Sequence, residues 1–279
     1  MQRKGENSLD WNKIKTIFII TFLILDIFLF FQFIQKRNNS QLEIMVEENI
    51  EEQLAANKIT HVDLPKEPAQ AAYITGKSRE FHEEETRSLK GQTVVLLDSK
   101  TIHSSLKDPI AIPKTDKGYF FEEFLRDSVL DGTKYKYWKL DEKEKKIYFF
   151  QQFKGKNIFH NQYAAIVADI NEKNEIVSYT QTMLTDVKEM GGESKAQEII
   201  TATKALKTLY LKGEIESGSR VTKVELGYYT VVIPSSSGFQ VIAPTWHFVL
   251  NGKDDYFVNA IEGQIIRMGK DNTQWSEVK

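Results

Sequence analysis

Few residues of this chain have types and spacings that could do chemistry, and the five histidines come first. They form no His-x-His or His-Glu-x-x-His pattern and no obvious carboxylate pair at metal-ligand spacing. Surface or half-buried positions are therefore expected for all five: His61, His82, His103, His160 and His247. Three glutamates follow His82, but four consecutive side chains point in different directions on a helix or a strand. This run is predicted to be a solvated face, and no metal site is expected.

The patterns of nucleophiles and phosphate-binding loops are also incomplete. Residues 235–238, Ser-Ser-Ser-Gly, lack a Gly-x-Ser-x-Gly elbow, so a hairpin loop explains them. Gly191-Gly192 lacks the Lys-Ser/Thr of a P-loop. The chain has no cysteine, which excludes disulfides and thiol catalysis. We expect neither enzymatic activity, nor catalytic residues, nor a bound cofactor.

Asp26 is the residue whose chemistry is least expected in its surroundings, because it lies inside an apolar run. From Ile17 to Ile34 the other polar side chains are Thr21 and Gln32. A helix of this length spans about 27 Å, close to the bilayer core of about 30 Å. The run is longer than a signal-peptide core, and no small-residue cleavage site follows it. The sequence therefore predicts an uncleaved signal anchor with a single membrane span.

Basic residues around the run predict its orientation. Four of them precede it and two follow it: Arg3, Lys4, Lys13, Lys15, Lys36 and Arg37. The positive-inside rule then places the N-terminus in the cytoplasm and the remaining chain outside the cell membrane. Trp11, just before the run, is expected to anchor the helix at the membrane interface, because its ring suits the headgroup layer.

The role of Asp26 has two interpretations. A carboxylate at the centre of an isolated span costs about 2.5–3.5 kcal/mol on insertion scales. Either the apolar residues outweigh this cost and Asp26 has no partner, or Asp26 faces a transmembrane helix of another protein. In the second case a hydrogen bond to a polar group offsets the cost. The helix face around Asp26, the predicted partner contact, comprises Ile19, Phe22, Leu23, Asp26, Leu29, Phe30 and Phe33.

The chain beyond the run is acidic. Residues 38–279 hold 31 basic and 36 acidic residues, which gives a net charge of −5. An acidic region is a poor candidate for binding polyanions through bulk charge. No nucleic-acid partner is therefore expected.

Three amphipathic helices are predicted in this outer region, at residues 40–57, 118–130 and 194–213. The first begins with a capping box of Ser40 and Glu43, and the third with one of Ser194 and Gln197. Each helix presents one apolar stripe that needs a sheet or another helix to cover it.

Strand-like runs rich in β-branched and aromatic residues follow the second and third helices. Those after the second helix are residues 135–140, 146–153, 163–170 and 175–184. Those after the third are residues 221–226, 228–233, 245–250, 256–261 and 264–268. Trp138 and Trp246 lie in such runs, so a place in the sheet core is expected, with a binding surface as the alternative. Residues 60–113, which contain four prolines, are expected to form a less regular connection with one strand at 93–97.

The repeated order of helix and strands indicates a diverged duplication, although any antiparallel hairpin has a similar pattern. The predicted fold class is α+β, with one N-terminal transmembrane helix and two helix-plus-antiparallel-sheet units. The expected boundaries are a cytoplasmic N-terminus at 1–15, the span at 16–35, a juxtamembrane helix and connection at 36–116, and the two units at 117–190 and 191–279.

Several of these features together resemble the YycI (WalI) family of Firmicutes. They are the segment DWNKIKTIFIITFLILDIFLFFQFIQK at 10–36, the acidic helix after it, the lack of cysteine, and PTWHFVLNGKDDYFVNAIEGQII at 244–266. The resemblance implies a single-span accessory protein that acts with YycH on the sensor histidine kinase YycG (WalK) of a cell-wall two-component system. It also implies an extracytoplasmic region similar to the C-terminal domains of YycH. Residues 1–9 precede the point at which a member is expected to begin.

Two functions therefore compete. The first is a membrane adaptor that biases a kinase between signalling states by differential contact with each state. The second is an anchored extracytoplasmic domain that binds a wall-derived ligand or inhibits a wall enzyme, with the span as a tether. An adaptor needs one specific helix face, whereas a tether accepts any apolar helix, so Asp26 discriminates between them.

Overall fold

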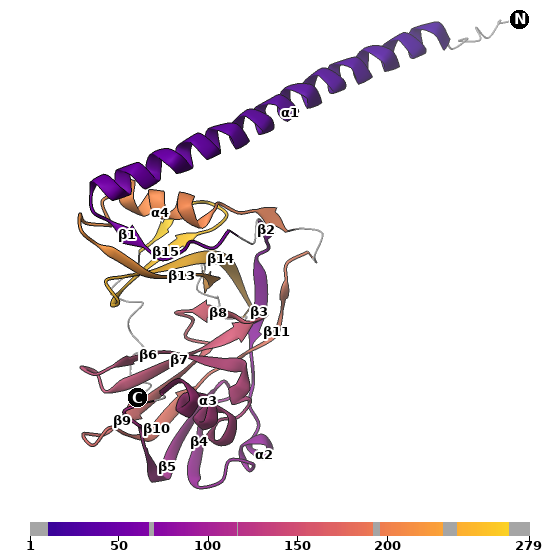
Figure 1. The fold of residues 1–279 in the computed structure, drawn as a ribbon. Coiled ribbons are helices and arrows are strands. Elements are labelled where there is room, and N and C mark those ends of the chain that lie inside the picture. Colours follow the sequence, from indigo (N-terminus) through magenta and orange to yellow (C-terminus); the bar gives the residue numbers. More distant parts are fainter. Residues whose placement is uncertain (1–10, 67–69, 116, 192–195, 231–238, 268–279) are drawn as a thin grey trace, which may run out of the picture. The chain divides into compact units, whose positions relative to one another are not determined.

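The structure is a computed structural model that describes residues 11–66, 70–115, 117–191, 196–230 and 239–267 (Figure 1). The serine-rich segment at 235–238 and Ser194 lie outside the described residues. The chain divides into two compact units, Met1–Asn57 and Lys58–Lys279.

The first unit contains one long helix, α1 (Trp11–Ala56). The separate helix expected from Ser40 is therefore part of α1, and Ser40 with Glu43 does not form an N-terminal cap. The physical reason is that residues 33–40 contain neither proline nor glycine, so nothing breaks the helix where the apolar run ends. The helix ends before Lys58, whose positive φ of 56° places it in the left-handed region.

The second unit is built on a 14-stranded sheet of the described residues. Its strands are β1 (Thr60–His61), β3 (Ile74–Ser78), β4 (Gln92–Asp98), β5 (Thr101–Ala111), β6 (Tyr135–Asp141), β7 (Lys146–Phe153), β8 (Lys156–Phe159), β9 (Ala165–Ile170), β10 (Glu175–Gln181), β11 (Leu184–Glu189), β13 (Arg220–Thr230), β14 (Phe239–Leu250), β15 (Asp254–Asn259) and β16 (Ile265–Ile266). The order is β11-β3-β14-β13-β8-β7-β9-β10-β5-β4, with β1, β6, β15 and β16 off this path. Most pairs are antiparallel, and β13 pairs in parallel with β1 and β8.

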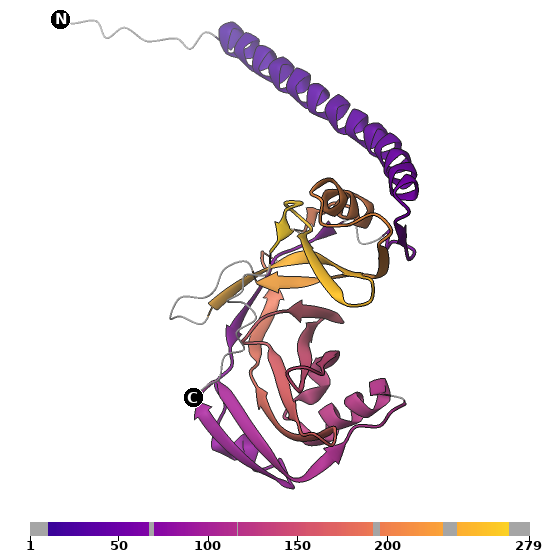
Figure 2. The ribbon, with the colours of Figure 1, turned by 90° about the vertical axis from the view of Figure 1, so that its left-hand side faces the viewer.

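Four helices and a small strand pair complete the described fold with α1. They are α2 (Glu83–Thr86), α3 (Lys117–Ser128), the 3-10 turn η1 (Gly132–Lys134), α4 (Ala202–Leu211), and β2 (Gln70–Ala71) paired with β12 (Gln197–Glu198). Helix α3 with β4–β7, β9 and β10 (the α3 half) and helix α4 with β13–β16 (the α4 half) lie at opposite ends of the second unit (Figures 1 and 2). The expected mixed α+β class is confirmed, with sheet as the larger part.

Each of the two longer helices of this unit is followed by an antiparallel meander. After α3 the strands pair in the order β6-β7-β9-β10, and after α4 in the order β13-β14-β15-β16. The α3 half is closed by an apolar core in which Phe121 and Phe124 of α3 pack on Phe149 and Tyr179 of the sheet. In the α4 half, Trp246 is 1% exposed and its Nε1 donates a hydrogen bond to the carbonyl of Ile200, so its predicted core position is confirmed.

The start of the third predicted helix was wrong. Helix α4 begins after Thr201, whose hydroxyl accepts a hydrogen bond from the backbone nitrogen of Lys204 at 3.2 Å. Gln197, expected inside the helix, instead lies in β12 and pairs with Ala71. A local capping pattern was therefore overridden by strand pairing, and a hydroxyl cap seven residues later was used instead.

The strand expected at 93–97 is confirmed as part of β4, but the expectation of an otherwise irregular connection was wrong for the segment 60–113. This segment supplies β3, β4 and the 11-residue strand β5 to the sheet. The physical reason lies in β5, where buried Ser104 and half-buried His103 replace the apolar residues that mark a strand in the sequence. Pro109 lies in an exposed part of β5, where the missing N–H is tolerated.

The two strands expected at 221–226 and 228–233 form one strand, β13, that continues through Gly227 to Thr230, and residues 231–233 lie outside the described residues. A Cβ at this position would lie 2.2 Å from Cε2 of Phe159 and 2.7 Å from the carbonyl oxygen of Asn157. Glycine is therefore required here for close approach of β8 to β13, and not for a turn.

Candidate functional site

Helix α1 carries the residues predicted to contact a membrane partner. Residues Lys15–Gln32 form the one helical stretch of the described chain that is long and apolar enough to cross a membrane, and none of it is buried within the protein. Asp26 is exposed on this stretch, and so are Ile19, Phe22, Leu23, Leu29 and Phe30. The side chain of Phe33 lies outside the described residues.

The polar residues of the run differ in how they are satisfied. The Thr21 hydroxyl donates a hydrogen bond to the carbonyl of Ile17 at 2.8 Å, so it needs no outside partner. No side chain or backbone group of the described residues bonds to the carboxylate of Asp26. Trp11 opens the helix with 69% of its surface exposed, at the end where the interface anchor is predicted.

A second polar centre lies inside the sheet of the other unit, around His247 of β14. Its Nδ1 lies 3.0 Å from Glu225 Oε1 of β13, and its Nε2 lies 2.7 Å from Asp255 Oδ1 of β15. Register explains the meeting: His247 pairs with Glu225 on one side and with Phe257 on the other, and Asp255 is two residues from Phe257 on the same face. Because a carboxylate only accepts hydrogen bonds, both ring nitrogens must donate, and the ring is an imidazolium.

The electrostatics of this centre agree with its geometry. Burial opposes protonation of His247, which is 1% exposed, but the two carboxylates outweigh burial and raise its pKa. Burial works against ionisation of Glu225, yet hydrogen bonds from His247 and Lys223 lower its pKa to about 2. Burial also opposes ionisation of Asp255, and His247 with Lys139, whose Nζ lies 3.6 Å from Oδ2, lowers its pKa.

The second histidine of this region, His160, has the opposite environment. Its ring lies against Trp138, Phe150 and Phe257, with centroid distances of 4.8, 5.4 and 5.4 Å. Its Nε2 is buried without a hydrogen-bond partner among the described residues. Burial, together with the charges of Lys139 and His247, lowers the pKa of His160 to about 3, so the ring is neutral.

Of the five histidines, His247 alone corrects the expectation of surface or half-buried positions. His247 is fully buried, while His82 is exposed and His61, His103 and His160 are intermediate by residue surface. The sequence gave no signal for the cluster, because Glu225 and Asp255 are 22 and 8 residues from His247 and only the strand register brings them together. Among the described residues, no three His, Asp or Glu side chains are placed to hold a metal ion. The three side chains of the His247 cluster satisfy one another across the sheet.

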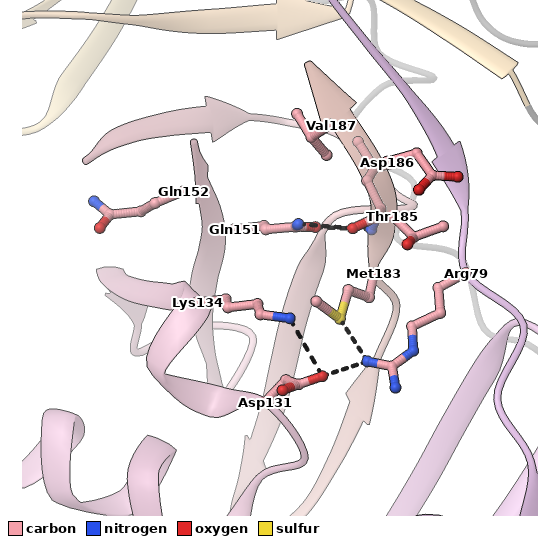
Figure 3. Close-up of a pocket in the computed structure, with 10 residues that line it drawn as sticks. Arg79, Asp131, Lys134, Gln151, Gln152, Met183, Thr185, Asp186 and Val187 are labelled. Atoms are coloured by element: carbon pink, nitrogen blue, oxygen red, sulfur yellow. Dashed lines mark hydrogen bonds and ion pairs between the residues drawn. The ribbon is translucent and has the colours of Figure 1, made fainter. Parts of the chain in front are cut away.

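A polar cleft of about 490 Å³ lies between the ends of β7 and β11 (Figure 3). On its floor the guanidinium of Arg79 contacts Asp131, Glu85 and the sulfur of Met183, and Lys134 lies 3.5 Å from Asp131. Burial opposes ionisation of Asp131, but Arg79 and Lys134 outweigh it and lower its pKa. Arg79 and Lys134 of the cleft thus have carboxylate partners, while the carboxylate of Asp186, which also lines the cleft, is exposed.

The glutamates after His82 contribute to this arrangement. Glu85 accepts a hydrogen bond from the backbone nitrogen of His82 at 3.0 Å and from Arg79 at 2.5 Å. Glu83 and Glu84 are exposed, as a solvated face requires. The predicted solvated face therefore does not include all three glutamates, because Glu85, in the first turn of α2, binds Arg79.

Comparisons with known proteins decide the family. The family described as YycI protein matches residues 38–261. The chain belongs to the YycI family. The matched region excludes the segment 10–36, so the match rests on the chain after the apolar run and not on the residues around Asp26.

Two solved structures are similar to this YycI chain. One is an uncharacterized protein from Eubacterium rectale, with 11% identity over 76% of this chain and 91% of that one, at a TM-score of 0.40. The other is YycH from Bacillus subtilis, with 12% identity over 72% of this chain and 54% of that one, at a TM-score of 0.38. No curated protein matches. Membership in the YycI family supports an accessory regulatory role in the YycFG system, and it favours a protein without enzymatic activity.

Proposed function

We propose that this YycI protein is a single-span membrane adaptor that modulates the sensor histidine kinase YycG (WalK) together with YycH. In this proposal α1 crosses the cell membrane with its N-terminus in the cytoplasm, and the sheet unit lies outside. The family match supports the regulatory role, and the apolar stretch Lys15–Gln32 supports the anchor. The two helix-plus-meander units, α3 with β6-β7-β9-β10 and α4 with β13-β14-β15-β16, are proposed to be diverged copies.

The observation that carries the adaptor role is the carboxylate of Asp26, which has no partner within the described chain. A polar group at mid-span is costly in lipid, and a hydrogen bond to a neighbouring helix offsets part of the cost. The face around Asp26 then packs against a transmembrane helix of the kinase complex. Differential contact with the kinase states would bias their populations.

The test compares Asp26→Asn and Asp26→Leu with Thr21→Val, which alters a polar residue on another face that is already satisfied within the helix. Interhelical polar contacts are worth about 0.6 to 2 kcal/mol, so Asp26→Leu should reduce co-purification of the kinase several-fold. Asn should have a milder effect because its amide still forms hydrogen bonds, and Thr21→Val should have none. Protein levels are held constant, and expression of kinase-controlled wall-hydrolase genes is the second readout.

The competing function is an anchored domain that binds a wall-derived ligand or inhibits a wall enzyme. The polar cleft at Arg79 is the feature that favours it, but the cations there already have carboxylate partners. If Asp26→Leu and a scrambled apolar span both keep kinase association and gene expression at wild-type levels, the adaptor proposal fails and α1 is a tether.

A further inference from the structure

The edges of the 14-stranded sheet are protected very unequally. An exposed edge strand offers unpaired N–H and C=O groups to any other strand, and soluble proteins usually block it with charges, bulges, proline or short length. Most edges in the described part of the chain use these devices. Strand β4 does not.

Strand β11, at one end of the sheet order, shows how an edge is blocked. Its ladder with β3 breaks between Thr185 and Lys188, and Asp186 within this bulge has a positive φ of 53°. The side-chain amide of Gln151 bonds both backbone groups of Leu184, at 2.8 and 2.9 Å, so it occupies the place of a neighbouring strand. Bulge, charge and amide together prevent strand addition here.

The remaining edges carry similar devices. Strands β1 and β16 have two residues each. Strand β6 carries two lysines and an aspartate, and the part of β5 beyond β4 contains Lys107, Asp108 and Pro109. Each is too short, too charged or too irregular to add a strand efficiently.

Strand β4, at the opposite end of the sheet order, has the sequence QTVVLLD, with no charge, glycine or proline before Asp98. Val94 and Leu96 pack on the α3 core, while Val95 and Leu97 on the other face are 49% and 42% exposed. A run of this composition has the properties of a strand that pairs readily with another strand.

The ladder with β5 shows which backbone groups of β4 are available. The backbone nitrogen of Lys107 donates a hydrogen bond to the carbonyl of Gly91. In an antiparallel ladder every second residue bonds to the same neighbour, so the backbone groups of Thr93 and Val95 also point toward β5. The N–H and C=O groups of Val94 and Leu96 therefore point to the open edge. Each of these two residues thus offers one N–H donor and one C=O acceptor, at the spacing that an added antiparallel strand requires.

We propose that β4 is a homotypic docking edge that pairs in antiparallel fashion with β4 of a second copy of this chain. A two-fold axis through Val95 places Val94 against Leu96 of the other copy, so the open backbone groups of both strands are satisfied. Asp98 follows the shift in the β4 ladder after Leu96, so no carboxylate lies opposite another one within residues 92–96. The strand is thus complementary to itself in backbone pattern, side-chain face and charge.

The size of this contact predicts that it is weak in dilute solution. One strand pair supplies only a few hydrogen bonds, each worth about 0.5–1.5 kcal/mol net. Copies that share one membrane meet at a much higher effective concentration, which favours such a pairing. The test therefore uses the full chain in membranes.

The lack of cysteine makes cross-linking of introduced thiols unambiguous. Val95→Cys should form disulfide-linked dimers under mild oxidation, because non-hydrogen-bonded antiparallel pairs have Cα atoms about 4.5 Å apart, within disulfide range. Thr93→Cys, on the same strand and exposed on the same face, should give about tenfold less dimer because it faces Leu97 and not itself. Co-expression of differently tagged Thr93→Cys and Leu97→Cys chains should restore cross-linking between the two tags.

Three results would overturn the pairing. One is no dimer from Val95→Cys and none from the mixed Thr93→Cys and Leu97→Cys chains. A second is equal dimer from Val95→Cys and Thr93→Cys, which indicates random collision. The third is a cross-link from Val95→Cys to a different protein, which assigns the edge to another partner. His103→Cys, one strand inward, serves as the background control.

Discussion

Two ionisable centres of this protein, at Asp26 and at His247, are satisfied in opposite ways. His247 is buried in a sheet whose register brings Glu225 and Asp255 to both of its ring nitrogens. Asp26 is exposed on an apolar helix, and the described chain provides no partner for it. One centre is complete within the fold, and the other is complete only if something outside the chain contacts it.

This difference predicts that the His247 centre affects the stability of the fold, whereas Asp26 affects binding to a partner. A buried ion pair that loses one member leaves an uncompensated charge, which strongly destabilises the fold. Asp26 lies in the stretch Lys15–Gln32, none of which is buried within the protein, so its replacement should leave folding unchanged. Removing a carboxylate at His247 should therefore lower fold stability, and removing the carboxylate of Asp26 should lower partner association without changing fold stability.

The largest effect is expected from Asp255→Ala. This change removes one of the two carboxylates at His247 and leaves Lys139 without its partner, so the free energy of unfolding should fall by about 3–5 kcal/mol. Urea unfolding of the detergent-solubilised chain, followed by tryptophan fluorescence, measures it, since Trp246 is buried in the same unit. Asp254→Ala, at the exposed neighbouring position, should change stability by less than about 0.5 kcal/mol. Equal effects of the two changes would mean that the cluster contributes nothing.

A smaller effect is expected from pH, through His160. Its pKa is about 3 in the folded protein and about 6.5 in an unfolded chain, so the unfolded state binds the proton first as the pH falls. Stability should therefore decrease by about 1.4 kcal/mol per unit between about pH 6.5 and 4.5. His247, whose pKa is raised, stays protonated in this range and adds little slope; its own contribution is lost only as the pH rises through its folded pKa.

The variant that tests this is His160→Asn, since asparagine tolerates the positive φ of 47° at this position. Unfolding curves at four pH values should show a flatter acid-side slope than in the wild type, whatever the change in stability at pH 7. An unchanged slope would show that His160 is not the group that titrates.

The smallest effect on folding is expected from Asp26→Leu. The unfolding free energy of residues 58–279 within the full chain should stay within about 0.5 kcal/mol of the wild type, because Asp26 belongs to the other unit. Asp255→Leu, the same substitution at the buried centre, serves as the matched comparison. Should Asp26→Leu destabilise the sheet as much as Asp255→Leu, the separation of the two centres is wrong.

A structural feature could be predicted from the sequence where neighbouring residues determine it, and not where residues far apart in the chain determine it. The apolar run, the aromatic stripe of α3 and the Trp246 core position follow from residue type and spacing, and the structure agrees with them. Strand β5 was missed because its buried positions include Ser104, whose hydroxyl is satisfied by Gln92 from β4. Polar residues with partners across a sheet do not show the alternation that marks a strand.

The candidate sites show the same limit. Asp26 was identified from sequence because lipid-length apolar runs tolerate few charges. The cluster at His247 could not be identified, because residues from three strands meet only through their register. Gly227 was interpreted as a break between strands for a related reason, since nothing local shows that the Phe159 ring will lie against it.

The unbroken course of α1 makes it a torsional element. With 46 residues in one helix, each residue turns the chain by about 100°, so the azimuth of Asp26 is fixed relative to that of Ala56. If the proposed neighbour at Asp26 rotated the helix, the rotation would reach its far end, because no flexible joint lies between them. Inserting one residue between them would change this phase by about 100°, while seven residues would nearly restore it.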